Sequence, residues 1–249
     1  MQTFIAGYCE ISLIKSASER RNHFEPETDG YYNRKANTSS ANTIGNDTGR
    51  TGWEIECYPA GAIELDIACG NGNYSSYLAQ RGASVVAFDY SKKMIELAKR
   101  RRSQYAKQIE FCVADATNRE SLLGLKRNRA FTKAVSNMAI MDITDIEPLF
   151  MAVYELLEEN GIFVFATQHP CFITLTEKYM TPHSYYGIAI EGQPEEQIYY
   201  HRSIQDIFNL CFRAGFVIDG FYEECFKNNK EIPMVMIVRL KKVKRDSLK

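Results

Sequence analysis

Between residues 62 and 167, the chain alternates short apolar segments with stretches of helical periodicity. Five segments have the length and composition of buried strands: 62–67, 84–88, 109–114, 131–136 and 162–167. Apolar residues recur at helical spacing between them, and Gly82 and Ser91 are suited to end one helix and to cap the next. Regular alternation of strand and helix is typical of a parallel sheet with helices on both faces.

The helix before the fifth strand has a start signal of its own. Thr144 and Glu147 have the spacing of a capping box, in which the two side chains satisfy backbone N–H groups of the first turn. The pattern therefore predicts a helix from this point through Leu157, stopped by Asn160 and Gly161.

The C-terminal part of the chain predicts one further helix and a strand pair. Residues 204–211 place apolar side chains on one helical face, and Gly215 follows as a stop signal. The apolar segments 216–222 and 234–240 are joined only by a loop, so we expect them to pair as antiparallel strands.

Two segments lie outside this pattern. Residues 33–52 are dominated by Asn, Thr, Ser and Gly and predict a loop, whereas residues 168–200 look irregular and are rich in Tyr and His. We therefore divide the chain into an N-terminal segment 1–58, a possible lid, and a domain 59–249 with a cover insertion at about 168–200.

A glycine-containing turn directly follows the first predicted strand. Gly70 and Gly72 lack side chains, so backbone N–H groups can approach a ligand closely at this point. A turn of this kind is compatible with a dinucleotide, with another nucleotide-like ligand, or with a tight strand–helix connection that binds nothing.

Three acidic residues narrow the choice of ligand. Asp89 ends the second strand 19 residues after Gly70, where a carboxylate can accept both hydroxyls of a ribose, unless it only caps the next helix. Asp115 ends the third strand, where it can accept the amine of an adenine. Asp66 precedes the glycine turn, where a carboxylate opposes a diphosphate but suits a ligand carrying ammonium and sulfonium charges.

With these residues in place, the sequence resembles the class I S-adenosylmethionine-dependent methyltransferases. Segment 64–72 is similar to the family's glycine-rich motif, with Ala68 where the family has its first glycine; 86–91 is similar to the ribose motif, 113–116 to the adenine motif, and 136–139 to the segment beside the methyl group. The resemblance implies an α/β, doubly wound, Rossmann-like fold with a mostly parallel seven-stranded sheet whose last strand is antiparallel. It also implies S-adenosylmethionine as cofactor, bound by Asp66, Ala68, Gly70, Gly72, Asp89, Tyr90, Asp115, Ala116, Asn137 and Met138.

His169 is the candidate catalytic residue. It follows the predicted fifth strand by two residues, so it starts at the edge of the expected pocket, and its ordinary pKa suits a general base. A histidine that only hydrogen-bonds the backbone near Pro170 is the alternative. The tyrosines at 179, 185, 186, 199 and 200 are candidates to line an acceptor pocket or to cover the core.

Composition limits the partners. The chain has 249 residues with 30 Lys+Arg and 31 Asp+Glu, and this near balance argues against nucleic-acid binding. No apolar run approaches a membrane span, and none of the seven cysteines forms a C-x-x-C pair, so we expect a cytoplasmic protein without a metal site.

These features predict a methyltransferase acting on a small-molecule acceptor. A non-catalytic protein that binds the same cofactor remains an alternative. So does a nicotinamide-dependent oxidoreductase, although Asp66 and Asp115 count against it. The acceptor and the oligomeric state are not determined by the sequence.

Overall fold

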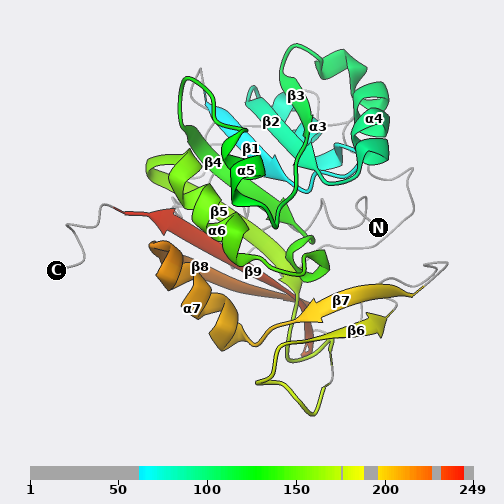
Figure 1. Cartoon of the computed structure of the whole chain (residues 1–249), viewed down its shortest axis with the longest axis vertical. Helices are drawn as coiled ribbons and strands as arrows, with labels where there is room; N and C mark the ends of the chain where they lie inside the picture. Colours follow the sequence, from blue (N-terminus) through cyan, green and yellow to red (C-terminus); the bar gives the residue numbers. More distant parts are fainter. Residues whose placement is uncertain (1–61, 175, 188–195, 226–230, 244–249) are drawn as a thin grey trace, which may run out of the picture.

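The computed structural model describes residues 62–174, 176–187, 196–225 and 231–243. Seven strands form one sheet in the order β3-β2-β1-β4-β5-β9-β8 (Figure 1). They are β1 (Ile63–Ile67), β2 (Ser84–Asp89), β3 (Ile109–Val113), β4 (Phe131–Asn137), β5 (Leu157–Gln168), β8 (Phe216–Cys225) and β9 (Pro233–Lys242). β9 runs antiparallel to both of its neighbours, β5 and β8, and the other strand pairs of the sheet are parallel, which confirms the predicted sheet with its antiparallel last strand.

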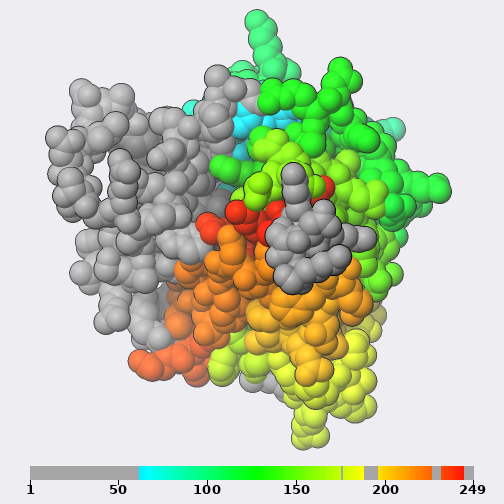
Figure 2. Space-filling model, turned by 90° about the vertical axis from the view of Figure 1, so that its left-hand side faces the viewer, coloured from blue at the N-terminus to red at the C-terminus, as the bar shows by residue number. Residues whose placement is uncertain are grey.

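Helices cover both faces of the sheet. The helices are α3 (Asn73–Gln80), α4 (Lys92–Arg101), α5 (Arg119–Leu123), α6 (Glu147–Leu156) and α7 (Ile204–Ala214), with short 3-10 helices η2 (Ser103–Tyr105) and η3 (Ile140–Asp142). Along β2, Val85 and Ala87 pack with α3 and α4, whereas Val86 and Phe88 pack with α5, α6 and α7. This alternation makes β2 apolar on both sides, as expected of a strand inside a buried parallel sheet. Figure 2 shows the side of the molecule on which α6 and α7 lie.

The predicted capping box at Thr144 is wrong. α6 begins at Glu147, and Ile146 is its N-cap without a side-chain hydrogen bond. Asp145 accepts the Glu147 N–H at 3.0 Å instead, and Pro148 in the first turn has no N–H that needs a cap. The helix also ends earlier than predicted, because β5 already begins at Leu157.

The segment 168–200, predicted to be irregular, contains a β-hairpin. β6 (His183–Gly187) and β7 (Gln197–His201) pair antiparallel, with Tyr185 opposite Tyr199. On β7, Tyr199 and His201 are buried, whereas Tyr200 between them is only partly buried and Ile198 is 43% exposed, so this strand has a two-residue period that its aromatic composition concealed. The hairpin lies beyond the carboxyl end of β5 (Figure 1).

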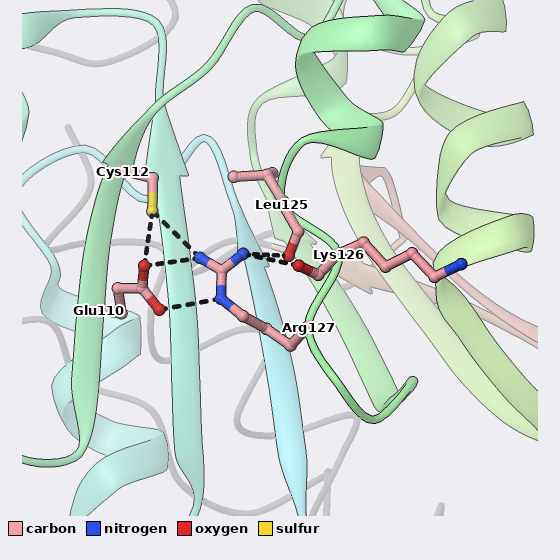
Figure 3. A network of polar contacts seen from close by, with 5 residues as sticks. All are labelled: Glu110, Cys112, Leu125, Lys126 and Arg127. Atoms are coloured by element: carbon pink, nitrogen blue, oxygen red, sulfur yellow. Dashed lines mark hydrogen bonds and ion pairs between the residues drawn. The ribbon is translucent and has the colours of Figure 1, made fainter.

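A network of hydrogen bonds and an ion pair lies at β3, the edge strand of the sheet (Figure 3). Arg127 donates to both carboxylate oxygens of Glu110, at 2.6 and 3.0 Å, and to the carbonyl oxygens of Leu125 and Lys126. The bidentate contact with Arg127 lowers the pKa of Glu110. A paired charge on an edge strand also discourages pairing with a second sheet.

The predicted N-terminal lid, residues 1–58, lies outside the described residues. In the described parts of the chain, no helix has both the length and the apolar character that crossing a bilayer requires.

Candidate functional site

The sheet brings the predicted ligand residues to one edge. β1 lies between β2 and β4, so the strand order reverses beside it, and open α/β sheets bind ligands at the carboxyl ends of strands at such a point. The turn after β1, Asp89 at the end of β2, Asp115 after β3 and Asn137 at the end of β4 all meet this edge (Figure 1).

The turn after β1 has an unusual backbone. Ala68, Gly70 and Gly72 all have positive φ angles, of 53°, 53° and 75°. A side chain at Gly72 would also be crowded, because its Cβ would lie 2.8 Å from Cζ of Phe111. Ala68 stands where the family has its first glycine. Its left-handed backbone conformation is energetically unfavourable for a residue that has a side chain. The strain is located at the predicted ligand site.

Asp89 holds this turn in place. Its Oδ2 accepts the Gly70 N–H at 2.9 Å, and its Oδ1 accepts the Ser91 N–H at 2.8 Å. Each carboxylate oxygen can accept a further hydrogen bond. Asp89 can therefore fix the loop and accept two ligand hydroxyls at once, so its alternative role as a local cap does not exclude ligand binding.

Asp66 is a buried acid directly below the turn. Its side chain accepts a 2.5 Å hydrogen bond from the Ser75 hydroxyl, and the residue is 1% exposed. Burial raises the pKa of Asp66 to about 7, helped by the nearby Asp89 charge and opposed by the Ser75 hydrogen bond. A cation bound beside Asp66 would favour the ionised form. Ser75, a small polar residue in the first turn of α3, carries no signal in the sequence that predicts this contact.

One oxygen of the Asp115 carboxylate is available to accept a hydrogen bond from a ligand. Its Oδ1 accepts the N–H and the hydroxyl of Thr117, at 2.8 and 2.7 Å, while no described residue donates a hydrogen bond to Oδ2. Ala116 is buried, and Tyr90 on the neighbouring strand end is 76% exposed. A carboxylate oxygen, a small apolar residue and an exposed aromatic ring are suited to hold a nucleobase.

Asn137 and Met138 follow β4. Asn137 Oδ1 is buried and has no hydrogen-bond partner among the described residues, which is costly unless a ligand donates to it. Met138 has a φ of 52°, and its N–H donates to Ala166 O at 2.9 Å. This second strained residue adjoins the same edge of the sheet.

His169 is placed differently from the other predicted residues. Its ring is 1% exposed and uses both nitrogens within the protein. Nδ1 accepts the Cys171 N–H at 3.2 Å, so the proton lies on Nε2, which donates to Glu223 Oε1 at 2.8 Å. Glu223 lies on β8, and no local sequence pattern connects it with residue 169, so this contact could not be predicted.

The similarity of the sequence to a known protein family agrees with the geometry of this site. Residues 60–209, more than half of the chain, match the family described as "Methyltransferase domain". The ubiquinone biosynthesis O-methyltransferase of Pelagibacter ubique is 36% identical over 104 residues, which cover 41% of this chain and 40% of that protein. A putative methyltransferase of a Geobacillus species is 27% identical over a similar share, so the chain spans about two fifths of these relatives' length.

Solved structures share the fold. A putative S-adenosylmethionine-dependent methyltransferase from Listeria monocytogenes superposes with a TM-score of 0.59 at 21% identity, covering 76% of this chain and 95% of that one. Another from Mesorhizobium loti gives a TM-score of 0.55 at 24% identity, over 74% and 92% of the two chains. The strand order, the turn after β1 and the family match lead to one conclusion: this chain belongs to the methyltransferase domain family.

Proposed function

We propose that the protein transfers a methyl group from S-adenosylmethionine to a small-molecule acceptor. The observation that carries the proposal is the placement of Asp66, Asp89 and Asp115 around a left-handed glycine turn at the switch point of the sheet. The acids supply acceptors for an ammonium group, for ribose hydroxyls and for an adenine amine, and the turn leaves room for the ligand.

Each residue has a defined task in this proposal. Asp89 accepts the ribose hydroxyls through the lone pairs that Gly70 and Ser91 leave free. Asp115, Ala116 and Tyr90 hold the adenine, and Asp66 pairs with the ammonium group. The backbone at Ala68, Gly70 and Gly72 lies along the ligand, and Asn137 and Met138 border its methyl group.

The bound cofactor supplies an electrophilic methyl group on sulfur with a neutral thioether as leaving group. The protein therefore needs no acid for the leaving group; it aligns the acceptor and excludes water. The β6–β7 hairpin, which packs against η3 beyond the sheet edge, is the proposed cover. We further propose a cytoplasmic protein that binds neither nucleic acid nor a membrane, in keeping with its net charge of −1.

Hydroxyl compounds are the first acceptors to test. The Pelagibacter relative carries the name of an O-methyltransferase of ubiquinone biosynthesis. A screen of phenols, catechols and metabolite pools for S-adenosylhomocysteine release tests catalysis, and the absence of turnover with every acceptor would favour the non-catalytic alternative.

Calorimetry tests the cofactor. We expect S-adenosylmethionine and S-adenosylhomocysteine to bind, and NAD not to bind, because the Asp66 carboxylate opposes a diphosphate. Binding of NAD without binding of S-adenosylmethionine would replace the proposal with an oxidoreductase.

For His169, we propose a positioning role in place of the general base expected from the sequence. His169→Ala should lower the melting temperature by several degrees, because it removes two hydrogen bonds from a buried site, and it should reduce turnover less than about tenfold. The reduction should be in kcat and KM together, since the ring fixes the connection to the cover. A loss of ~10²-fold in kcat with an unchanged melting temperature would restore the role of base. Glu223→Gln, which keeps an acceptor for Nε2, is the milder control.

A further inference from the structure

A small pocket lies between the end of β5, η3 and the β6–β7 hairpin. Its volume is about 20 Å³, which is room for one group of the size of a water molecule, and it opens to solvent. The pocket adjoins the residues proposed to border the methyl group. Asn137 pairs with Ala166 in the sheet, and Gln168, which lines the pocket, comes two residues later on the same face, about 7 Å further along the strand.

Gln168 places a free hydrogen-bond donor in this pocket. The residue is 8% exposed, and its Oε1 accepts the Tyr185 hydroxyl at 2.9 Å. That contact fixes the side-chain amide, and no described residue accepts a hydrogen bond from Nε2. A polar side chain buried to this extent is normally hydrogen-bonded, so a ligand oxygen that accepts from Nε2 would complete the site.

Arg202 gives the pocket a positive charge. Among the described residues, its guanidinium donates only to backbone carbonyl oxygens, at 2.7 to 3.4 Å: those of Ile140, Tyr200, Ile143 and Thr144. These bonds fix the guanidinium, but carbonyl oxygens do not neutralise its charge, and no described acid forms an ion pair with it. Burial lowers the pKa of Arg202, so the charge is partly removed from water and would gain from an anion beside it.

The histidine in the lining is neutral. His201 Nε2 lies 2.8 Å from the carbonyl oxygen of Tyr179, to which it must donate, so Nδ1 accepts the Thr174 hydroxyl at 3.1 Å. Burial lowers the pKa of His201, which favours this neutral form. His201 therefore adds no charge to the pocket.

Two acids act on the lining from outside the pocket. The Asp142 charge contributes to the raised pKa of Tyr185, behind burial, and the Asp145 charge partly opposes the effect of burial on the pKa of Arg202. Neither acid is among the described residues that line the pocket. The lining thus combines a cation and a free N–H donor with no acid, which favours a negatively charged oxygen as ligand.

We propose that this pocket binds a carboxylate of the methyl acceptor. Gln168 Nε2 donates to one carboxylate oxygen, and Arg202 supplies the opposite charge. The inference rests on the proposed function and names its substrate class: a small carboxylic acid whose reacting O–H or N–H lies elsewhere in the molecule. The volume admits only the carboxylate end, so the rest of the acceptor remains outside, where the sheet edge and the bound methyl group lie.

The first test follows the side-chain amide signal of Gln168 by NMR. Sodium benzoate would be added to ¹⁵N-labelled protein saturated with S-adenosylhomocysteine, and the signal is assigned by its loss in Gln168→Glu. Benzoate should shift this signal and should bind about ten-fold or more tightly than benzamide, which has the same shape without the charge. In Gln168→Glu, a carboxylate replaces the donor, so the affinity for benzoate should fall by about ten-fold or more, measured on the other shifted signals.

The matched control is Gln197→Glu, the same substitution on the β6–β7 hairpin. Gln197 Oε1 also accepts a tyrosine hydroxyl, that of Tyr199 at 3.5 Å, but Gln197 is exposed and does not line the pocket. This variant should retain the wild-type affinity for benzoate. Equal melting temperatures and equal affinities for S-adenosylhomocysteine would show that both variants are folded and keep the cofactor site.

The second test uses the acceptors found by S-adenosylhomocysteine release. Those that are methylated should carry a carboxylate, and converting it to an amide should raise KM by about ten-fold or more. Gln168→Glu should likewise raise KM more than it lowers kcat.

Two results would overturn the carboxylate site. One is a Gln168 signal that neither benzoate, acetate nor phenylacetate shifts, which would leave a pocket that holds only water. The other is turnover restricted to acceptors without a carboxylate. A wild-type protein that does not bind S-adenosylhomocysteine would instead overturn the proposed function.

Discussion

Replacing Asp89 with alanine should weaken the binding of S-adenosylmethionine by at least about 100-fold. The variant loses the acceptor for two ribose hydroxyls, and each charge-assisted hydrogen bond contributes roughly 1.5–3 kcal/mol. It also frees the N–H groups of Gly70 and Ser91, which Asp89 holds at 2.9 and 2.8 Å, so the turn after β1 loses its main support. Calorimetry would measure the affinity, and a thermal melt would report the accompanying loss of stability.

Asp115→Ala is the matched control for Asp89. Asp115 ends the neighbouring strand, but one of its oxygens is already committed to Thr117, at 2.8 and 2.7 Å, and only one ligand contact depends on it. The Asp115→Ala variant should bind S-adenosylmethionine about ten-fold more weakly, which corresponds to one hydrogen bond of about 1.5 kcal/mol. Asp89→Asn, which keeps one acceptor oxygen, should fall between the two. An equal or larger loss at position 115 would refute this ranking.

Replacing Asp66 with asparagine should have opposite effects on stability and on binding. The pKa of Asp66 is raised in the folded protein to about 7, so the folded state holds a proton that the unfolded state has already lost. In the ligand-free protein, the contribution of Asp66 to the free energy of unfolding should therefore be greatest at about pH 4 and below, and should fall as the pH rises to about 7. The fall is at most about 4 kcal/mol, from a difference of about three pKa units.

The Asp66→Asn variant has no carboxyl to ionise, so this part of the pH dependence should disappear. At pH 8 the variant should be the more stable ligand-free protein, but it should bind S-adenosylmethionine at least about tenfold more weakly, having lost the charge that pairs with the ammonium group. Denaturant titrations from pH 4 to pH 8, with calorimetry at pH 8, would measure both effects.

Ser75→Ala tests how much the Ser75 hydrogen bond contributes to the pKa of Asp66. The Ser75 hydroxyl donates a 2.5 Å hydrogen bond that lowers the pKa of Asp66. Without it, the pKa should rise further, and the midpoint of the pH dependence should move to higher pH. Wild-type protein and Asp66→Asn with the same pH dependence of stability between pH 4 and pH 7 would contradict the assignment of a buried, protonated Asp66.

Most of the sheet could be predicted because its signals are local. Buried parallel strands need continuous apolar segments, and the turns between strand and helix need residues such as Gly82 and Ser91; Ser91 indeed accepts the Met94 N–H as a cap. The glycine turn and the acids at positions 66, 89 and 115 lie at or within two residues of strand ends along the chain. The fold rule that strand ends share one edge was therefore sufficient to predict that these residues lie together.

The wrong predictions at Thr144 and in residues 168–200 also have local causes. At Thr144, the capping-box spacing was correct, but Asp145 competed for the same N–H and Pro148 removed the need for a cap. In 168–200, a hairpin rich in Tyr and His does not show the usual contrast between apolar and polar residues, because an aromatic side chain fits both faces. Tyr199 is buried and Tyr186 is 69% exposed, although both are the same residue type.

The sequence by itself determined the class of fold, the turn after β1 and the acids that surround it. Only the tertiary structure decided that β9 inserts between β5 and β8, that both nitrogens of the His169 ring are occupied, and that Arg202 binds the carbonyl oxygens of Ile140 and Ile143 from about 60 residues away. The raised pKa of Asp66 likewise depends on its burial in the folded protein. Burial and long-range hydrogen bonds depend on which segments the packed core brings together, and no spacing along the chain records that.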